Sequence, residues 1–278
     1  ATAHILAKYA TDQAGPASEA VQRGISVAVV TADHAIGDNE AFRKTVDMLL
    51  RAASEHGALC TIGVVPTRAE TGFGYIQIPE KTMDVPYYEV TAFHEKPSAE
   101  RAEAFVASGR YLWNSGMFFW TIRDFLSELD RVRPQLKTAT IAMAEAMRSD
   151  DVDRVRAIFE GLDDISIDCA LMEHARKVLV APADFSWDDV GMWSALDRSH
   201  RHDDHGNVIV GNPVVIDCSN CVIYEDRADG EHMAVGIVGM SDVVVVVTSD
   251  AVLVVPKDRA QDVRTVVEEL KRRGARQI

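Results

Sequence analysis

The feature that most constrains the fold of this chain is the alternation of short apolar strands with amphipathic helices in its N-terminal half. Ile25–Val30 is a β-branched run, and Leu59–Val65 is a second apolar run that ends before Pro66. Between them, Ala41–His56 repeats its apolar residues at the helical period, and Gly57 follows as a stop signal. This alternation predicts an α/β fold with a Rossmann-like, mainly parallel sheet covered by helices on both faces.

The same alternation continues to about residue 198. It predicts strands at Tyr87–Phe93, Met117–Trp120 and Lys177–Ala181, and helices at Ala99–Ser108, within residues 122–175 and at Met192–Arg198. Ser98 is a favourable N-cap for the helix at 99–108, Gly109 follows its end, and Pro134 is placed to begin a new helix. We therefore expect residues 1–198 to form one core domain.

The composition changes near residue 199. Apolar triplets recur at Val208–Val210, Val214–Ile216 and Val222–Tyr224, with Asn, Gly, Pro and Ser between them. Further strands are predicted at Val243–Thr248 and Ala251–Val255, followed by a helix capped by Asp258 and ending before Gly274. This spacing predicts a small β-rich, solenoid-like domain at 199–278. So few rungs are not stable alone, so we expect them to pack on the core or to join two subunits as a homodimer.

The charge balance disfavours some classes of partner. The net charge is −14, from 29 basic and 43 acidic residues, which argues against nucleic acid and anionic membranes. A small anionic substrate is still compatible, because a few local cations and a divalent metal can dominate one pocket. No apolar run reaches the length of a membrane span, and Ala1–Ala10 lack a basic-then-apolar signal pattern. The sequence predicts a cytoplasmic protein.

The chain has 4 cysteines, and one pair has a suggestive spacing. Cys218 and Cys221 lie between two apolar runs, so we expect them to bracket a turn. A zinc site needs further ligands at comparable spacing, and none is evident in the sequence, so a metal or redox role is the less favoured interpretation. His200, His202 and His205 fall in a polar loop, where a solvated surface is the favoured interpretation.

Two aspartates follow predicted strands, at the end where open α/β sheets bind ligands. Asp33 comes after Ile25–Val30, and Asp189 follows Lys177–Ala181 and precedes Gly191. Carboxylates from two strand ends can hold one Mg²⁺ while water and phosphate oxygens fill its other positions. The alternative is that each aspartate only caps a turn or a helix.

Three short motifs are weak when each is taken alone. Gly72-Phe73-Gly74-Tyr75 can bring bare backbone close to a ligand, but the glycines of a hairpin look the same. Glu95-Lys96-Pro97 pairs an acid with a base at a strand end, and a surface ion pair is the alternative. Asn114-Ser115-Gly116 precedes a buried strand, where an ordinary turn is expected from composition.

Taken together and in order, the motifs are specific. They are Ala32-Asp33-His34, Gly72-Phe73-Gly74-Tyr75-Ile76, Phe93-His94-Glu95-Lys96-Pro97, Trp113-Asn114-Ser115-Gly116-Met117-Phe118 and Trp187-Asp188-Asp189-Val190-Gly191-Met192-Trp193. With Ser166-Ile167-Asp168, Glu173 and residues 206–274, the chain closely resembles the mannose-1-phosphate guanylyltransferases of the sugar-phosphate nucleotidyltransferase family. The resemblance implies Mg²⁺-assisted in-line attack of α-D-mannose 1-phosphate on GTP, giving GDP-mannose and pyrophosphate.

The resemblance also implies roles for single residues. It implies Mg²⁺ ligands at Asp33 and Asp189, hydrogen bonds to mannose hydroxyls from Glu95 and Asn114, a contact to the sugar phosphate from Lys96, and a cover over the sugar at Gly72, Gly74 and Tyr75. Asp33, Lys96 and Asp189 are the predicted catalytic residues. A chemistry of two polyanions needs metal-holding carboxylates, a lysine and backbone amides rather than an activated nucleophile, which agrees with these assignments.

The sequence departs from the family pattern at its start. The glycine-rich loop that holds the nucleotide in this family is not found here, and Ala1-Thr2-Ala3 is similar to a segment downstream of that loop, near the base pocket. This similarity implies nucleotide binding at Thr2. We expect a fragment of a longer protein; the alternatives are a natural non-catalytic relative that binds sugar phosphate or regulates, and a partner that supplies the loop. Within enzymes, the alternative is transfer to another sugar 1-phosphate, such as a heptose or glucose.

Overall fold

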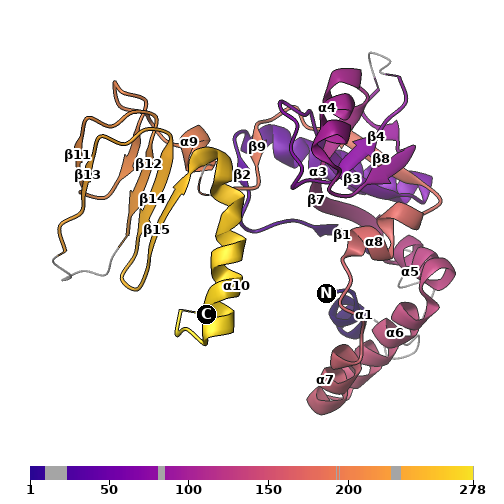
Figure 1. The fold of residues 1–278 in the computed structure, drawn as a ribbon. Helices are drawn as coiled ribbons and strands as arrows, with labels where there is room; N and C mark the ends of the chain where they lie inside the picture. The colour runs from indigo at the N-terminus through magenta and orange to yellow at the C-terminus, as the bar shows by residue number, and fades with distance from the viewer. Residues whose placement is uncertain (10–23, 81–84, 192, 194, 227–232, 278) are drawn as a thin grey trace. The chain divides into compact units, whose positions relative to one another are not determined.

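The computed structural model describes residues 1–9, 24–80, 85–191, 193, 195–226 and 233–277. The chain forms two compact units, Ala1–Trp187 (unit 1) and Asp188–Ile278 (unit 2), and each is described by itself (Figure 1). The domain boundary that composition suggests, near residue 199, stays a prediction.

The main sheet of unit 1 is built on one long strand. Its strands are β1 (Ser26–Val29), β3 (Leu59–Val64), β4 (Tyr75–Gln77), β5 (Tyr88–Glu89), β6 (Ala92–His94), β7 (Tyr111–Thr121) and β8 (Val178–Pro182). They are hydrogen-bonded in the order β5-β8-β3-β7-β4-β6, and β1 also pairs with β7. The two-residue strands β2 (Ala35–Ile36) and β9 (Trp187–Asp188) lie outside this sheet. Strands and helices therefore make an α/β unit, as expected.

The strand directions correct the expectation of a mainly parallel sheet. Among the described residues, β3 and β8 pair in parallel, whereas β7 pairs antiparallel with β1, β3 and β4, and β4–β6 and β5–β8 are also antiparallel. Alternating elements give parallel strands only when a helix crosses over between neighbours in the sheet. Here β7 lies between β3 and β4 and runs antiparallel to both, and the alternation of strands and helices along the chain did not fix which strands become neighbours in the sheet.

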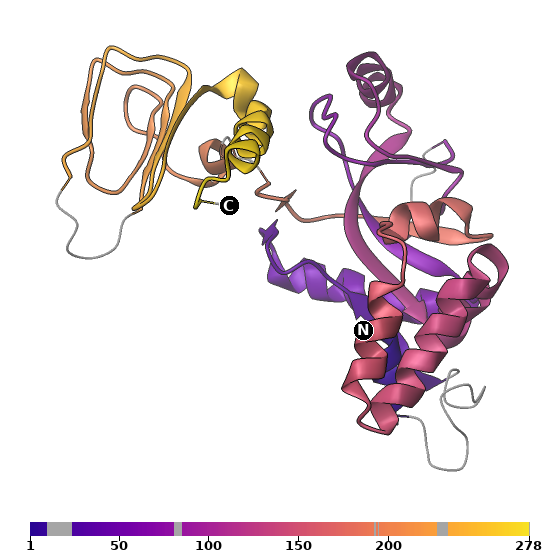
Figure 2. The same ribbon diagram turned by 60° about the horizontal axis from the view of Figure 1, so that its bottom comes forward.

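Helices cover both faces of this sheet. They are α1 (Thr2–Tyr9), α3 (Asn39–His56), α4 (Ala99–Ser108), α5 (Ile122–Val132), α6 (Pro134–Arg148), α7 (Val152–Glu160), α8 (Ile167–Ala170) and the 3₁₀ helix η1 (Met172–His174). Helix α3 packs on β3 and β7, while α1, α5, α6 and α7 form a group in which neighbours pack together (Figures 1 and 2).

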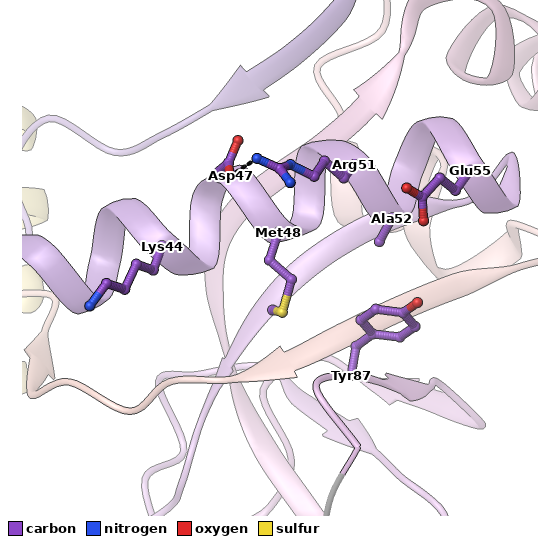
Figure 3. Close-up of a pocket in the computed structure, with 7 residues that line it drawn as sticks. All are labelled: Lys44, Asp47, Met48, Arg51, Ala52, Glu55 and Tyr87. Carbon is purple, nitrogen blue, oxygen red and sulfur yellow. Dashed lines mark hydrogen bonds and ion pairs between the residues drawn. The ribbon is translucent and has the colours of Figure 1, made fainter.

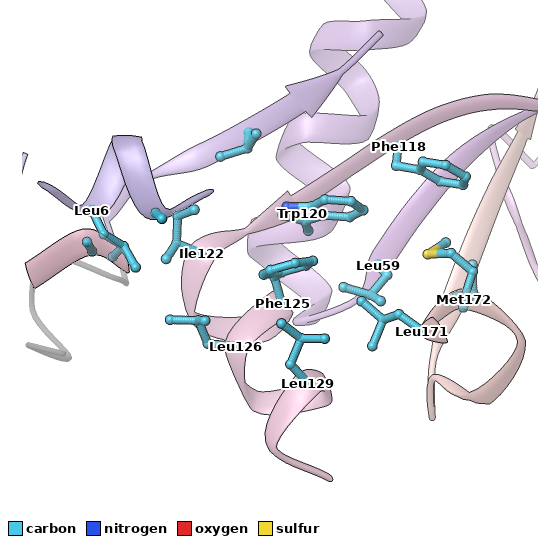
Figure 4. Close-up of a cluster of buried hydrophobic side chains, with 14 residues drawn as sticks. Leu6, Leu59, Phe118, Trp120, Ile122, Phe125, Leu126, Leu129, Leu171 and Met172 are labelled. Carbon is cyan, nitrogen blue, oxygen red and sulfur yellow. The ribbon is translucent and has the colours of Figure 1, made fainter. Parts of the chain in front are cut away.

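Alternation along β7 divides the core between the two faces, because successive side chains of a strand point to opposite sides. Phe118 and Trp120 join a cluster that includes Leu6 of α1 and Leu126 of α5 (Figure 4). Phe119 joins a second cluster, which α3 covers on the other face.

Several local signals in the sequence are confirmed. Gly57 ends α3 in a left-handed conformation with φ 58°, as predicted, and the structure adds an N-cap at Asp38, which accepts hydrogen bonds from two backbone amides. Ser98 and Gly109 cap α4 in the same way, and Pro134 begins α6. Caps act within one helical turn, which explains why short stretches of sequence predict them.

Two sequence expectations in unit 1 are corrected. The strand predicted at Tyr87–Phe93 is two strands, because β5 pairs with β8 and β6 pairs with β4. The Asn114–Gly116 segment is not a turn: it lies inside β7, where the pairing with β3 shifts between Thr61 and Gly63 and Gly116 has φ 70°. An irregularity of this kind bends a strand and re-aims its side chains.

Unit 2 has the coiled β architecture that the apolar triplets predict. Its strands are β10 (Val208–Val210), β11 (Val214–Ile216), β12 (Val222–Glu225), β13 (Gly236–Val238), β14 (Val243–Val247) and β15 (Val252–Pro256). Strands β10, β12 and β14 stack in parallel, as do β11 and β13, and β15 closes the first sheet antiparallel to β14. Val243–Val247 is buried throughout.

The helices of unit 2 are α9 (Ala195–Ser199), the 3₁₀ helix η2 (Lys257–Asp262) and α10 (Val263–Arg273). Gly274 ends α10, as expected, but the residue before its first turn is Asp262 and not Asp258, because η2 lies between. Over the described residues, no helix combines the length and the apolar character needed to span a bilayer.

Cys218 and Cys221 bracket a turn between β11 and β12, as predicted. Both are buried free thiols, and their Sγ atoms donate to backbone carbonyls of their own coil and of the next one. In the part of the chain that is described, no group of three or more His, Cys, Asp and Glu side chains could hold a metal ion.

Candidate active site

The register of the main sheet brings three of the predicted site residues together. Tyr75, the first residue of β4, pairs with His94 on one side and with Trp113 on the other. Because both pairs are antiparallel, one step back along β4 corresponds to one step forward along β6 and β7. Gly74, Glu95 and Asn114 therefore lie side by side on three neighbouring strands, at the start of β4.

The contacts at Gly74 are too close for a side chain. A Cβ atom on Gly74 would lie 2.6 Å from Oε2 of Glu95 and 3.5 Å from Cβ of Asn114. The Gly74 carbonyl accepts a hydrogen bond from the Asn114 backbone N–H at 2.8 Å. Glycine at this position leaves backbone, carboxylate and amide accessible to one another.

The side-chain amide of Asn114 is held at both of its ends. Its Nδ2 donates to Oδ1 of Asp168 at 2.7 Å, and its Oδ1 accepts from the backbone N–H of Gly116 at 3.2 Å. Asp168 lies on α8, whose N-terminus is capped by the Ser166 hydroxyl accepting from the Cys169 N–H.

The surroundings of Glu95 make its carboxyl group a weaker acid than that of an ordinary glutamate. Burial, followed by the negative charges of Asp168 and Glu173, raises the pKa of Glu95 above its ordinary value. Lys96 opposes this shift, and its Nζ lies 3.6 Å from Oε1 of Glu95. A carboxylate acceptor, an amide and an ammonium group are thus assembled on one edge, a set that suits a ligand with hydroxyl and phosphate groups.

A buried carboxylate supports the glycine loop before β4. Glu70, 8% exposed, accepts hydrogen bonds from the Gly72 N–H at 3.1 Å and from Nε of Arg68 at 3.2 Å. Its own backbone N–H donates to the hydroxyl of Tyr75 at 3.0 Å. The ring of Tyr75 is fully buried and its hydroxyl supports the loop, while its predicted contact to the sugar stays a prediction.

Aromatic rings link this loop to the turn that carries Asp33. Phe73 packs edge-on against Trp113 and Trp187, and Nε1 of Trp187 donates to Nδ1 of His34 at 3.1 Å. The accepting Nδ1 leaves the ring proton on Nε2, which lies 3.9 Å from Oδ1 of Asp33. The Asp33 side chain is 86% exposed, so its carboxylate oxygens are accessible to a ligand.

Asp189 lies in a strained turn of unit 2. Oδ1 of the preceding Asp188 accepts from the Val190 N–H at 2.9 Å, and Arg198 donates to both carboxylate oxygens of Asp188 at 2.6 and 3.0 Å. Val190 has φ 50°, and a Cβ on Gly191 would lie 2.6 Å from Oδ2 of Asp189. Asp33 and Asp189 belong to different units, so their shared metal site stays a prediction.

The remaining predicted site residue, Thr2, is the first residue of α1, which packs against α6. Its neighbours Ala3 and Leu6 are buried in the core cluster of Figure 4. Nucleotide binding at Thr2 stays a prediction.

Two residues of the site did not emerge as candidates from the sequence. Asp168 appears there only as part of the Ser166-Ile167-Asp168 resemblance, and Glu70 in no motif at all. An acidic residue just before a glycine pair, as at Glu70, is a signal that could have been read, because a buried carboxylate can accept from the amides of a tight loop. Asp168 offers no local signal, since its partner is 54 positions away.

A separate groove of about 290 Å³ follows the outer side of α3 (Figure 3). It is lined by Lys44, Asp47, Met48, Arg51, Ala52, Glu55 and Tyr87. Its cations have acidic neighbours: Arg51 pairs with Asp47 at 2.7 Å, and Lys44 pairs with Glu40 at 2.8 Å. None of the predicted site residues lines it, so it is not the candidate active site.

Comparisons with known proteins identify the family of the chain. The Nucleotidyl transferase family matches residues 8–205, and the MannoseP isomerase/GMP-like beta-helix domain matches residues 211–270. A mannose-1-phosphate guanylyltransferase of Klebsiella pneumoniae is 40% identical over 247 residues, covering 87% of this chain and 51% of the relative. One from Escherichia coli (strain K12) is 38% identical over 280 residues, covering 99% of this chain and 56% of the relative.

Among solved structures, a "mannose-1-phosphate geranyltransferase" from Thermus thermophilus is similar to the chain with a TM-score of 0.77 and 37% identity, covering 91% of this chain and 72% of the other. The chain spans about half the length of the curated relatives it matches. The family predicted from the motifs is confirmed: this chain belongs to the nucleotidyl transferase family, among relatives named mannose-1-phosphate guanylyltransferase.

Proposed function

We propose that this chain takes part in the transfer of GMP from GTP to α-D-mannose 1-phosphate, with release of pyrophosphate. The observation that carries the proposal is the meeting of Gly74, Glu95 and Asn114 at one edge of the sheet. These are the positions at which the resemblance implies contacts to the sugar. The names of relatives with about 40% identity support the same reaction.

In this proposal the protein binds and orients reactants that are already reactive. A phosphate oxygen of the sugar phosphate bonds to the α-phosphorus of GTP, and the bond from that phosphorus to the leaving pyrophosphate breaks. Glu95 accepts a hydrogen bond from a sugar hydroxyl, and Asn114 donates one. The ammonium group of Lys96 offsets the charge of the sugar phosphate, which lowers the repulsion between the two anions.

Asp33 and Asp189 are the proposed ligands of a divalent metal, and Mg²⁺ is the ion that we propose. Their carboxylate oxygens are the hard donors that Mg²⁺ prefers, and the exposure of Asp33 leaves its oxygens accessible. When bound, the ion would neutralise charge on the phosphates.

The test is pyrophosphate release by the chain with GTP, mannose 1-phosphate and Mg²⁺. Wild type is expected to release pyrophosphate, and Glu95→Gln and Asp189→Ala to release much less. Asp153→Asn, which removes a 97% exposed carboxylate, is the matched control. Faster release with glucose or heptose 1-phosphate would replace mannose as the substrate. Tight binding of sugar phosphate with no release would overturn transfer and favour a binding or regulatory subunit.

We also propose that unit 2 joins two copies of the chain. The support is an apolar groove of about 470 Å³ on this unit, with Val238, Val252 and Val254 63%, 63% and 58% exposed. Strand β15 ends its sheet among the described residues, and an exposed apolar strand invites pairing. Sedimentation of wild type as a dimer and of Val254→Glu as a monomer is expected; a monomeric wild type would refute this assembly.

A further inference from the structure

We propose that Asp168 is a positioning residue that fixes Asn114 as a hydrogen-bond donor toward the sugar. This proposal rests on the proposed function, because it assumes that sugar phosphate binds beside Gly74 and Glu95. It adds a specificity residue to the site: Asp168 decides which end of the Asn114 amide a ligand meets.

The orientation of the amide follows from its two partners. An ionised carboxylate only accepts hydrogen bonds, so the amide nitrogen of Asn114 and not its oxygen faces Asp168, at 2.7 Å. A backbone N–H only donates, so the amide oxygen faces Gly116, at 3.2 Å. The two contacts agree on one orientation, and the contact to a charged group is the stronger of the two.

The fixed amide offers a defined pattern to a ligand. The Nδ2 atom carries two hydrogens, and Asp168 takes one of them, so the other can donate. The neighbouring Glu95 carboxylate, beside Gly74, can only accept while it is ionised. One donor next to one acceptor fits two adjacent hydroxyls of a pyranose, of which one accepts from Asn114 and the other donates to Glu95.

Asp168 is itself held by the core. It lies on α8, whose first turn is capped by Ser166, and the residues that follow it, Ala170, Leu171 and Met172, are 2% exposed or less. The carboxylate thus reaches Asn114 from a well-anchored helix, as a positioning residue requires.

Asp168 also acts on Glu95 through its charge. It is the second cause, after burial, of the raised pKa of Glu95, and Glu173 adds to it while Lys96 opposes it. Asp168→Asn should therefore lower the pKa of Glu95. Loosened packing that exposed Glu95 would lower this pKa as well, so the positioning role is tested on the Asn114 amide itself.

The first experiment needs no ligand. In the full chain, the two side-chain amide protons of Asn114 should give well-separated NMR signals, one of them shifted by the carboxylate of Asp168. In Asp168→Asn this separation should shrink, and in Asp168→Glu, which keeps an acceptor-only group, part of it should return. Signals that are the same in wild type and Asp168→Asn would overturn the positioning role.

The second experiment measures binding of mannose 1-phosphate by calorimetry, with inorganic phosphate as the reference ligand. Asp168→Asn is expected to weaken mannose 1-phosphate binding about tenfold, as for loss of a hydrogen bond to a charged group, and to leave phosphate binding unchanged. Asp153→Asn is the matched control, and circular dichroism checks folding of each variant.

The outcomes separate the two proposals. Equal binding of mannose 1-phosphate by wild type and by folded Asp168→Asn would sink the positioning role and leave the proposed function intact. A wild type that shows the separated Asn114 signals but binds no sugar phosphate would refute the proposed function and keep only the fixed amide. Equal weakening toward both ligands would identify a general structural role and overturn specificity.

Discussion

Left-handed backbone occurs both in the coils of unit 2 and at the predicted site, but different residue types occupy it in the two places. In the coils of unit 2 it falls on Asp217, Asn220 and Asp242, with φ 51°, 52° and 57°. Asp and Asn tolerate this conformation, because their short side chains can hydrogen-bond locally. Beside the predicted site residues it falls on Lys96 and Val190, with φ 42° and 50°, and neither residue type favours it. The residue types of the coil turns thus suit the left-handed backbone, whereas the residues at the predicted site adopt it at a steric cost, as functional positions often do.

Two asparagines show the same contrast. Asn207 in unit 2 is 2% exposed, and both ends of its amide bind groups of the protein. Its Nδ2 donates to Asp203 and to the Cys218 carbonyl, each at 3.0 Å, and its Oδ1 accepts from the Cys221 N–H at 2.9 Å. Asn114 donates one side-chain hydrogen to Asp168, and in our proposal the other donates to a ligand. A saturated amide serves stability, and an unsaturated one at a surface serves binding.

Gly74→Ala should separate binding from stability in unit 1. The new Cβ would lie 2.6 Å from Oε2 of Glu95, so the carboxylate must move. A displacement of this size is expected to lower kcat/KM for mannose 1-phosphate about 100-fold, with little change in melting temperature. The control is Gly236→Ala in unit 2, where nothing lies within 4 Å of the added atom. Equal activity losses in the two variants would show that the effect does not come from the crowded site.

Asn207→Ala should do the reverse in unit 2. It leaves the Cys221 N–H and the Cys218 carbonyl buried without their side-chain partner, at a cost of about 2 kcal/mol. Hydrogen exchange in the full chain should speed up for residues 207–225, while binding of mannose 1-phosphate is unchanged. Asn114→Ala is the counterpart, expected to impair binding and spare exchange. The contrast between the two asparagines fails if both variants change the same quantity.

Two glutamates extend the comparison to pH. The pKa of Glu269 in unit 2 is lowered by hydrogen bonds from Arg272 and Arg273, while burial raises that of Glu95 above 4.5. A raised folded-state pKa means that the stability contribution of Glu95 is full below its unfolded value and is lost as the pH rises through the folded value. The pH dependence of ligand binding has the opposite sign, because only the ionised carboxylate of Glu95 accepts the hydrogen bond from the sugar.

Mannose 1-phosphate binding should therefore weaken as the pH falls, beginning above the ordinary pKa of a glutamate. Calorimetry across the pH range would measure this loss of affinity. Glu95→Gln should lack it, and Glu269→Gln should keep it unchanged. If the affinity of Glu95→Gln falls with the same midpoint pH, the titrating group is the ligand or another residue.

The sequence predicted what depends on neighbouring residues. The stop of α3 at Gly57, both caps of α4 and the triplets of unit 2 act within a few positions, and these were found. The direction of β7 and the irregularity at Asn114–Gly116 depend on pairing with β3, more than 50 positions away, and were missed.

The candidate site shows the same limit. The meeting of Glu95 and Asn114 was expected from a family resemblance, and the register of β4 explains it physically. The part played by Asp168 depends on a contact with a residue 54 positions away, so no spacing in the sequence encodes it, whereas Glu70 lies two positions before Gly72 and its local signal was not read. Tyr75 has a structural part that the motif did not indicate, because its ring is buried in the core, and its predicted contact to the sugar stays a prediction.

Val190→Gly tests whether the strain beside Asp189 is functional. Glycine adopts φ 50° without the steric cost of a β-branched residue, so the turn should gain up to about 1 kcal/mol, seen as slower hydrogen exchange near residue 190. Asp217→Gly is the matched control in a coil turn, where an exposed aspartate already tolerates φ 51° and little gain is expected. If Val190 aims the Asp189 carboxylate, the stabilised variant should also need more Mg²⁺ for half-maximal pyrophosphate release. Equal gains in the two turns would mean that Val190 stores no more strain than an ordinary coil residue, and the contrast between the two kinds of turn would then be lost.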